Sequence, residues 1–245
     1  MIKKFALIIL FLVIIFFTLA LFLLPSILDK NMNPVTEHAP YLVSDKAKKM
    51  HKSLIVGDWH ADSALWNRDL KKTYDYGHVD IPRLQKGNVA LQMFTTVTKS
   101  PAGQNYTKNS SDSRDNITAL AIVQMWPIRT WFSLYERAIF QSNKIRSLAK
   151  RDPNNFMLIE SRNDLDIFLS KRKNNPELVG GLIGTEGSHA LDGSIDNIER
   201  LYKNGFRMMS LQHFFDNKLG GSLHGTSGNG LTEFGIKAIN EMMRL

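Results

Sequence analysis

His60 and Asp62 are the first residues whose types and spacing suggest chemistry, and they lie just past the apolar run 54–56, with Gly57 between. In an extended segment, side chains two residues apart point to the same side of the chain. Imidazole nitrogen and carboxylate oxygen are both good zinc ligands. The pair therefore predicts a shared metal ion, and the alternative is a surface histidine that happens to lie near an aspartate.

Two further polar side chains follow apolar runs that are typical of strands. Glu186 comes after residues 178–183 with glycines close by on both sides, which permits close approach of a ligand, and His213 comes after residues 206–211. Barrel enzymes place their catalytic groups at such strand ends, so we expect these side chains to meet at one rim. His213 could instead be a satisfied core histidine, and His189 could either orient Glu186 or pack beside it.

Short apolar strands alternate with helical segments along the chain, which favours a parallel sheet covered on both faces. A second His-x-Asp pair, His78 and Asp80, precedes Ile81 and Pro82 and predicts a structural turn into a helix. No Gly-x-Gly-x-x-Gly turn follows a strand, so a barrel is preferred to a doubly wound dinucleotide fold. The predicted strands are 54–59, 90–97, 156–159, 178–183 and 206–211, and one predicted helix is 164–171.

A long insertion at about 99–152 begins as a polar loop and continues as a helical stretch rich in aromatic residues, among them Trp126 and Phe140. Aromatic residues at this spacing usually pack in a core. Pro127 should kink or split the helix. The functional alternative is a lid over the barrel mouth, made by a lengthened loop.

The N-terminus carries the apolar stretch Phe5–Leu24, long enough to cross a hydrocarbon core about 30 Å thick. It is longer than the apolar part of a cleaved signal peptide, so we expect a retained anchor. Lys3 and Lys4 precede it, which predicts a single-pass protein of the cell membrane with a cytoplasmic N-terminus and a periplasmic or extracellular catalytic domain. The expected division is an anchor at 1–29, a tether and the start of the domain at 30–52, and the barrel part at 53–245.

The composition limits which residues can bind a metal and which partners are expected. The chain of 245 residues contains no cysteine, so it forms no disulfide and any metal ligand must be His, Asp or Glu. The formal net charge is +8, but the basic residues are dispersed and are not interleaved with aromatic residues, which argues against a nucleic-acid partner.

Four ordered motifs resemble the membrane (renal-type) dipeptidases. They are Gly57-Asp58-Trp59-His60-Ala61-Asp62, Gly77-His78-Val79-Asp80-Ile81-Pro82-Arg83-Leu84-Gln85-Lys86-Gly87, Gly184-Thr185-Glu186-Gly187-Ser188-His189 and Ser210-Leu211-Gln212-His213. The resemblance runs from about residue 53 to the last residue and leaves out the anchor. It implies a (β/α)8 TIM-type barrel with two zinc ions, in which His60 and Asp62 bind the first ion and Glu186 bridges both. It also implies that His213 contacts the substrate carbonyl.

The sequence departs from this family pattern because it stops at Leu245, before the family's second-zinc histidines and about three of its eight strands. We therefore expect about five strands, an incomplete second zinc site and a truncated, inactive fragment of a membrane-anchored enzyme for zinc-dependent hydrolysis of dipeptides. Its expected partners are a dipeptide and the membrane, with a homodimer as one option. Two alternatives remain: another barrel hydrolase of the amidohydrolase type, which normally begins with His-x-His, and a non-catalytic membrane-tethered binding module.

Overall fold

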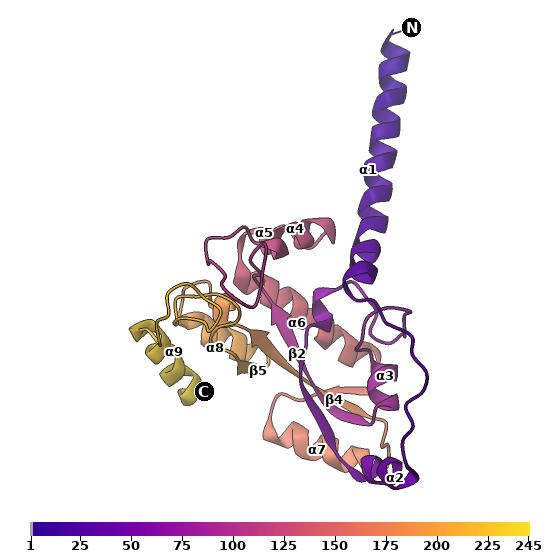
Figure 1. Ribbon diagram of the computed structural model, residues 1–245, viewed down its shortest axis with the longest axis vertical. Helices are drawn as coiled ribbons and strands as arrows, with labels where there is room; N and C mark the ends of the chain where they lie inside the picture. Colours follow the sequence, from indigo (N-terminus) through magenta and orange to yellow (C-terminus); the bar gives the residue numbers. More distant parts are fainter. Residues whose placement is uncertain (1) are drawn as a thin grey trace.

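Five strands form one sheet that carries the site residues, in a computed structural model that describes residues 2–245 (Figure 1). The side chain of Lys3, used above for the orientation, lies outside the described part of the structure. The strands are β1 (Val56–Ala61), β2 (Val89–Val97), β3 (Phe156–Leu158), β4 (Val179–Glu186) and β5 (Phe206–Met209).

All the strand pairs are parallel, which confirms the expected α/β class. The order is β1-β2-β4-β3, and β5 also pairs with β4, so the strands form an open part of a barrel. The longest register joins β2 to β4, from Leu91 opposite Gly180 to Val97 opposite Glu186. This register sets the end of β4, and with it Glu186, beside the end of β2.

The structure corrects the limits of the first strand. Residues 54–59 were expected, but β1 begins at Val56 and continues to Ala61, because parallel pairing extends until Ala61 lies opposite Phe94. His60 therefore lies within the strand. The expectation that both sheet faces are covered also fails at this edge, where the Trp59 side chain is 59% exposed.

The helices carry local signals that explain their limits. Asp80 is the N-cap of α3 and accepts a hydrogen bond of 2.9 Å from the Arg83 amide, which confirms that this aspartate starts a helix. The helices are α1 (Ile2–Met32), α2 (Asp45–Ser53), α3 (Ile81–Lys86), α4 (Asn116–Val123), α5 (Arg129–Phe132), α6 (Leu134–Arg151), α7 (Arg162–Arg172), α8 (Asp196–Lys203) and α9 (Glu233–Arg244), with 3-10 turns η1 (Ser63–Leu65) and η2 (Ser188–Leu191).

The insertion packs around its own apolar core. Its helical stretch is split near the proline, as the sequence predicted. Trp126 is 2% exposed and its ring lies 4.8 Å from that of Phe140. The helical stretch is interrupted around Pro127, since α4 ends at Val123 and α5 begins at Arg129. A separate main core lies under the sheet, where Phe94 and Phe156 meet edge to face at 5.8 Å.

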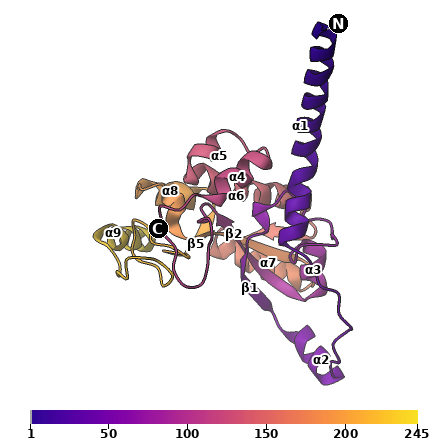
Figure 2. The same cartoon turned by 45° about the horizontal axis from the view of Figure 1, so that its top comes forward.

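The N-terminal helix α1 projects from the body, and its last turn is fixed to it (Figure 2). Residues Leu7–Met32 are apolar and long enough to cross a membrane, and none of the helix window is buried in the body. Asp29, by contrast, is buried and pairs with Arg68 at 2.9 Å. Asn33, just past the helix, accepts the Gly77 amide at 2.7 Å. The exit of α1 from the body is therefore defined by polar contacts.

Replacing Gly235 by alanine should destabilise the protein, although the same change usually stabilises a helix by up to about 1 kcal/mol. A Cβ at Gly235 would lie 2.1 Å from the Leu219 carbonyl oxygen, so the backbone must move. We expect a loss of about 1–3 kcal/mol, measured by thermal or chemical unfolding. The matched control is Gly230→Ala, where an added Cβ meets nothing within 4 Å. Equal stability of the two variants would contradict this packing.

Candidate metal centre

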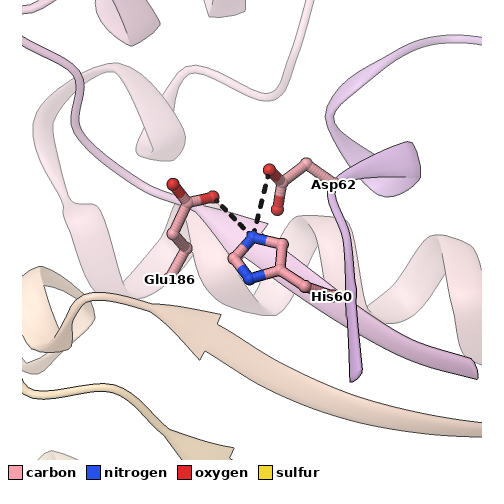
Figure 3. Close-up of side chains that lie close together, drawn as sticks. All are labelled: His60, Asp62 and Glu186. Carbon is pink, nitrogen blue, oxygen red and sulfur yellow. Dashed lines mark hydrogen bonds and ion pairs between the residues drawn. The ribbon is translucent and has the colours of Figure 1, made fainter. Parts of the chain in front are cut away.

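Three potential metal ligands converge at the carboxyl end of the sheet (Figure 3). His60 comes from β1, Asp62 follows that strand directly, and Glu186 is the last residue of β4. One ligand atom from each lies within 4.8 Å of the other two. Among the described residues, this is the group of acidic and histidine side chains that fits a metal ion. An imidazole with two carboxylates is a donor set that suits zinc.

The two carboxylates of this cluster favour a positive charge between them. The His60 Nε2 atom lies 3.5 Å from an Asp62 oxygen and 3.3 Å from a Glu186 oxygen. The hydrogen bond to Asp62, aided by the charges of both carboxylates, raises the pKa of His60 to about 9 against the opposing effect of burial. Burial raises the pKa of Asp62. Without a metal, therefore, a proton on His60 compensates the carboxylates, and a bound cation can take its place.

His213 lies on the other side of Glu186. Its Nε2 atom is 2.6 Å from the second Glu186 oxygen, and it follows β5 by a short loop. Burial opposes ionisation of Glu186, but the hydrogen bond from His213 and the nearby charge of His60 outweigh it and lower the pKa of Glu186 to about 2. The structure thus brings together all four residues that the sequence singled out, with Glu186 ionised between two histidines.

Thr95 is a further residue of this site that the sequence reading missed. It is fully buried on β2, and its hydroxyl donates a 2.5 Å hydrogen bond to Asp62. This bond fixes one carboxylate oxygen and leaves the other facing His60. The available signal was the presence of polar residues, Gln92, Thr95 and Thr96, inside an otherwise apolar strand.

Substituting Thr95 by valine should weaken metal binding about 10- to 100-fold, because a residue that hydrogen-bonds to a metal ligand holds that ligand in its binding orientation. Thr96→Val is the matched control, since the Thr96 hydroxyl donates to the Gly184 carbonyl and not to a ligand. Zinc titration by calorimetry or with a competing chelator measures the difference. An affinity that is the same for both variants would show that Thr95 does not orient Asp62.

Metal affinity should rise with pH up to about 9, because only the neutral imidazole coordinates a metal. Below the raised pKa of His60 the metal has to displace its proton, so apparent affinity should increase about tenfold per pH unit between pH 6 and 8. Calorimetry at pH 7 in two buffers of different ionisation enthalpy should detect about one proton released per metal. A flat affinity without proton release would refute protonation of His60.

A cavity of about 410 Å³ opens beside the cluster and reaches Asp62, Glu186 and His213. Helix α4 forms one wall with apolar side chains such as Leu120. The end of α1 forms another, through Leu28 and Met32. The insertion thus contributes both to packing and to the cavity wall. The contribution of α1 to the cavity wall was not expected, because the sequence predicts the anchor and the catalytic domain as separate segments.

His189 packs beside the site, which decides between the two interpretations left open for it. Its ring stacks on Phe215 with centroids 4.2 Å apart, and its Nε2 atom has no hydrogen-bond partner among the described residues. Burial, assisted by Lys99 and His213, lowers the pKa of His189 to about 4. It is therefore a neutral aromatic packing residue, and no hydrogen bond joins it to Glu186.

Comparison with known proteins identifies the family of the chain. The model of the membrane dipeptidase family, peptidase family M19, matches residues 44–245. The probable dipeptidase PvdM from Pseudomonas aeruginosa is similar in structure, with a TM-score of 0.54, 12% identity, and coverage of 80% of this chain and 46% of that one. A metallopeptidase from Rhodobacter sphaeroides, solved with a phosphinate mimic of the dipeptide L-Ala-D-Ala, gives a TM-score of 0.51 and 17% identity, with coverage of 78% and 56%.

A third solved structure, described as dipeptidase AC, has a TM-score of 0.51 and 18% identity, and the match covers 78% of this chain and 54% of that one. At these identities the likeness shows the fold alone. The chain spans about half the length of the solved structures it matches.

Proposed function

Because the chain belongs to the membrane dipeptidase family, peptidase family M19, we propose that it carries a zinc-dependent site for the hydrolysis of dipeptides. The observation that supports this most strongly is the convergence of His60, Asp62 and Glu186 within 4.8 Å, with His213 bonded to the same glutamate. The division into an anchor at 1–29, a tether at 30–52 and a catalytic part at 53–245 belongs to this proposal.

Each site residue has a role that its surroundings support. His60 and Asp62 bind the first zinc ion, and Glu186 offers one oxygen to it. Its other oxygen lies 2.6 Å from His213 Nε2, and Glu186 would be shared with a second zinc ion if the site holds two. When bound, zinc polarises a carbonyl group and lowers the pKa of water. Thr95 keeps Asp62 in its coordinating orientation.

His213 acts on the substrate in this proposal. It lines the cavity, and its side chain is 28% exposed, so a bound carbonyl oxygen can reach it. A hydrogen bond donated to that oxygen as negative charge develops would stabilise the transition state more than the ground state. Lys99 lines the same cavity and brings a positive charge to its wall, which suits the terminal carboxylate of a dipeptide.

The size of the cavity supports a small substrate. About 410 Å³ lies at the lower end of the range for ligand sites, which is about 300–1,000 Å³. The apolar walls from α1 and α4 would contact side chains of the dipeptide. Further parts of the proposal are a cytoplasmic N-terminus, a catalytic part outside the cell membrane and the option of a homodimer.

The test is cleavage of dipeptides by the purified full chain, loaded with zinc in detergent and followed by release of free amino acids. Cleavage that a chelator abolishes and zinc restores supports the proposal. A chain that takes up no zinc and cleaves no dipeptide would instead fit a non-catalytic membrane-tethered module. Zinc binding at His60, Asp62 and Glu186 without cleavage is the result expected of an inactive fragment. His213→Asn separates the roles, because it should lower cleavage and leave zinc content unchanged.

A further inference from the structure

The α4–α5 segment exposes large apolar side chains where a water-facing surface would be polar. Ile122 is 42% exposed, Met125 53%, Ile128 66% and Phe132 83%. Arg129 is the only charged residue between Asn116 and Phe132. A surface helix in water normally carries charged or polar residues on its outer face. We refer to these four apolar side chains as the α4–α5 surface.

The opposite side of this segment is firmly packed, so the exposure is a property of a fixed structure. Ile117 is 4% exposed and Ala121 is fully buried. The Trp131 indole donates to the Trp126 carbonyl at 3.1 Å, and the Thr130 hydroxyl donates to the Pro127 carbonyl at 2.7 Å. These contacts hold the loop between α4 and α5 in place and keep the α4–α5 surface turned outward.

The α4–α5 surface is continuous with the apolar helix α1. Met125 lines a cavity of about 270 Å³ together with Leu21, Phe22 and Pro25 of α1. Helix α4 contacts α1, and both views show α4 and α5 on the side of the body from which α1 projects (Figures 1 and 2). Met125 therefore lies at the level where the apolar stretch Phe5–Leu24 ends.

The neighbouring residues are those found where proteins meet lipid headgroups. Tyr74 and Tyr76 line the same cavity as Met125, with their rings 5.4 Å apart. Lys30 at the end of α1 and Lys72 in the adjoining loop are exposed. Tyrosine rings and lysine side chains are enriched at this depth because each has an apolar part and a polar end.

We propose that the α4–α5 surface rests on the lipid bilayer into which α1 inserts. This inference rests on the anchoring stated under the proposed function, and it adds a second membrane contact within the catalytic part of the chain. The partner is the outer part of a phospholipid leaflet, since the surface continues directly from α1. The cavity beside the metal centre, walled by α1 and α4, would then lie close to the membrane surface.

The absence of cysteine from the sequence allows a direct test with single spin labels on the full chain. Labels at Ile128→Cys and Phe132→Cys report on the α4–α5 surface, and a label at Leu12→Cys reports on α1. The matched control is Leu223→Cys, an equally apolar side chain that is 92% exposed in a loop far along the chain. Each variant is reconstituted in phosphatidylcholine nanodiscs, and collision rates with oxygen and with a water-soluble nickel chelate are compared.

We expect the oxygen-to-nickel accessibility ratio at positions 128 and 132 to exceed that at 223 at least threefold, and the ratio at 12 to be higher still. A ratio at 128 and 132 equal to that at 223, with position 12 in lipid, overturns this inference and leaves the anchor intact. Spin–spin broadening at 132 from a second copy also overturns it. A water-like ratio at position 12 refutes the anchoring itself, and the inference with it.

Discussion

Replacing Glu186 by glutamine is expected to lower zinc affinity by more than about 100-fold. Loss of a residue that only supports a ligand costs about 10- to 100-fold, and Glu186 is itself a charged ligand at the centre of the cluster. An amide has nearly the same shape, so the variant should keep its fold. Its His60 should also lose part of the raised pKa, since the Glu186 charge contributes to it.

The measurement is zinc content after dialysis, together with a competition titration against a chelator. Glu177→Gln is the control, because Glu177 is an exposed glutamate just before β4. It should bind zinc as the unchanged protein does. Full zinc occupancy in Glu186→Gln would mean that the chain binds zinc at a different place.

The second large effect is expected at Arg137, whose replacement by methionine should destabilise the protein by about 3–5 kcal/mol. Arg137 is 2% exposed and forms a 2.5 Å ion pair with Asp115. It also donates to the Thr98 carbonyl at 2.7 Å and to the Thr130 carbonyl at 2.6 Å. Removing it leaves a mostly buried carboxylate and two carbonyl groups without their donor.

Chemical unfolding in detergent measures this loss, and Arg137→Lys should recover only part of it, because lysine keeps the charge but lacks the planar fork. Arg244→Met serves as the control, since Arg244 pairs with Glu241 at an exposed position and its loss should change stability little. If Arg137→Met were no less stable than Arg244→Met, the buried network would not hold the insertion to the sheet.

The sequence predicted the class of fold because the five strands are short apolar runs separated by helical segments. Strand ends were less accurate, as β1 shows: its limits depend on pairing with β2, which continues past the last apolar residue to Ala61. Pairing between distant segments also decides the strand order, in which β2 lies directly beside β4. Neither property is encoded in a local pattern.

The candidate ligands were predictable because each lies near the carboxyl end of a strand, and the parallel sheet then brings them together. Their roles as ligands remain predictions. Thr95 and Arg137 were not foreseen, because a threonine in a strand and an arginine in a helix usually face solvent or pack without function. The contribution of Leu28 to the cavity could not be predicted from the sequence either. It depends on the buried contact between Asp29 and Arg68, two residues far apart in the sequence.

The central claim is that one zinc ion is held jointly by His60, Asp62 and Glu186. It is tested most directly by anomalous X-ray scattering at the zinc edge from crystals of the zinc-loaded chain. We predict a peak about 2.0–2.2 Å from His60 Nε2 and from one carboxylate oxygen each of Asp62 and Glu186. A zinc peak bound by other histidines, with these three side chains too far apart to share it, would contradict the account.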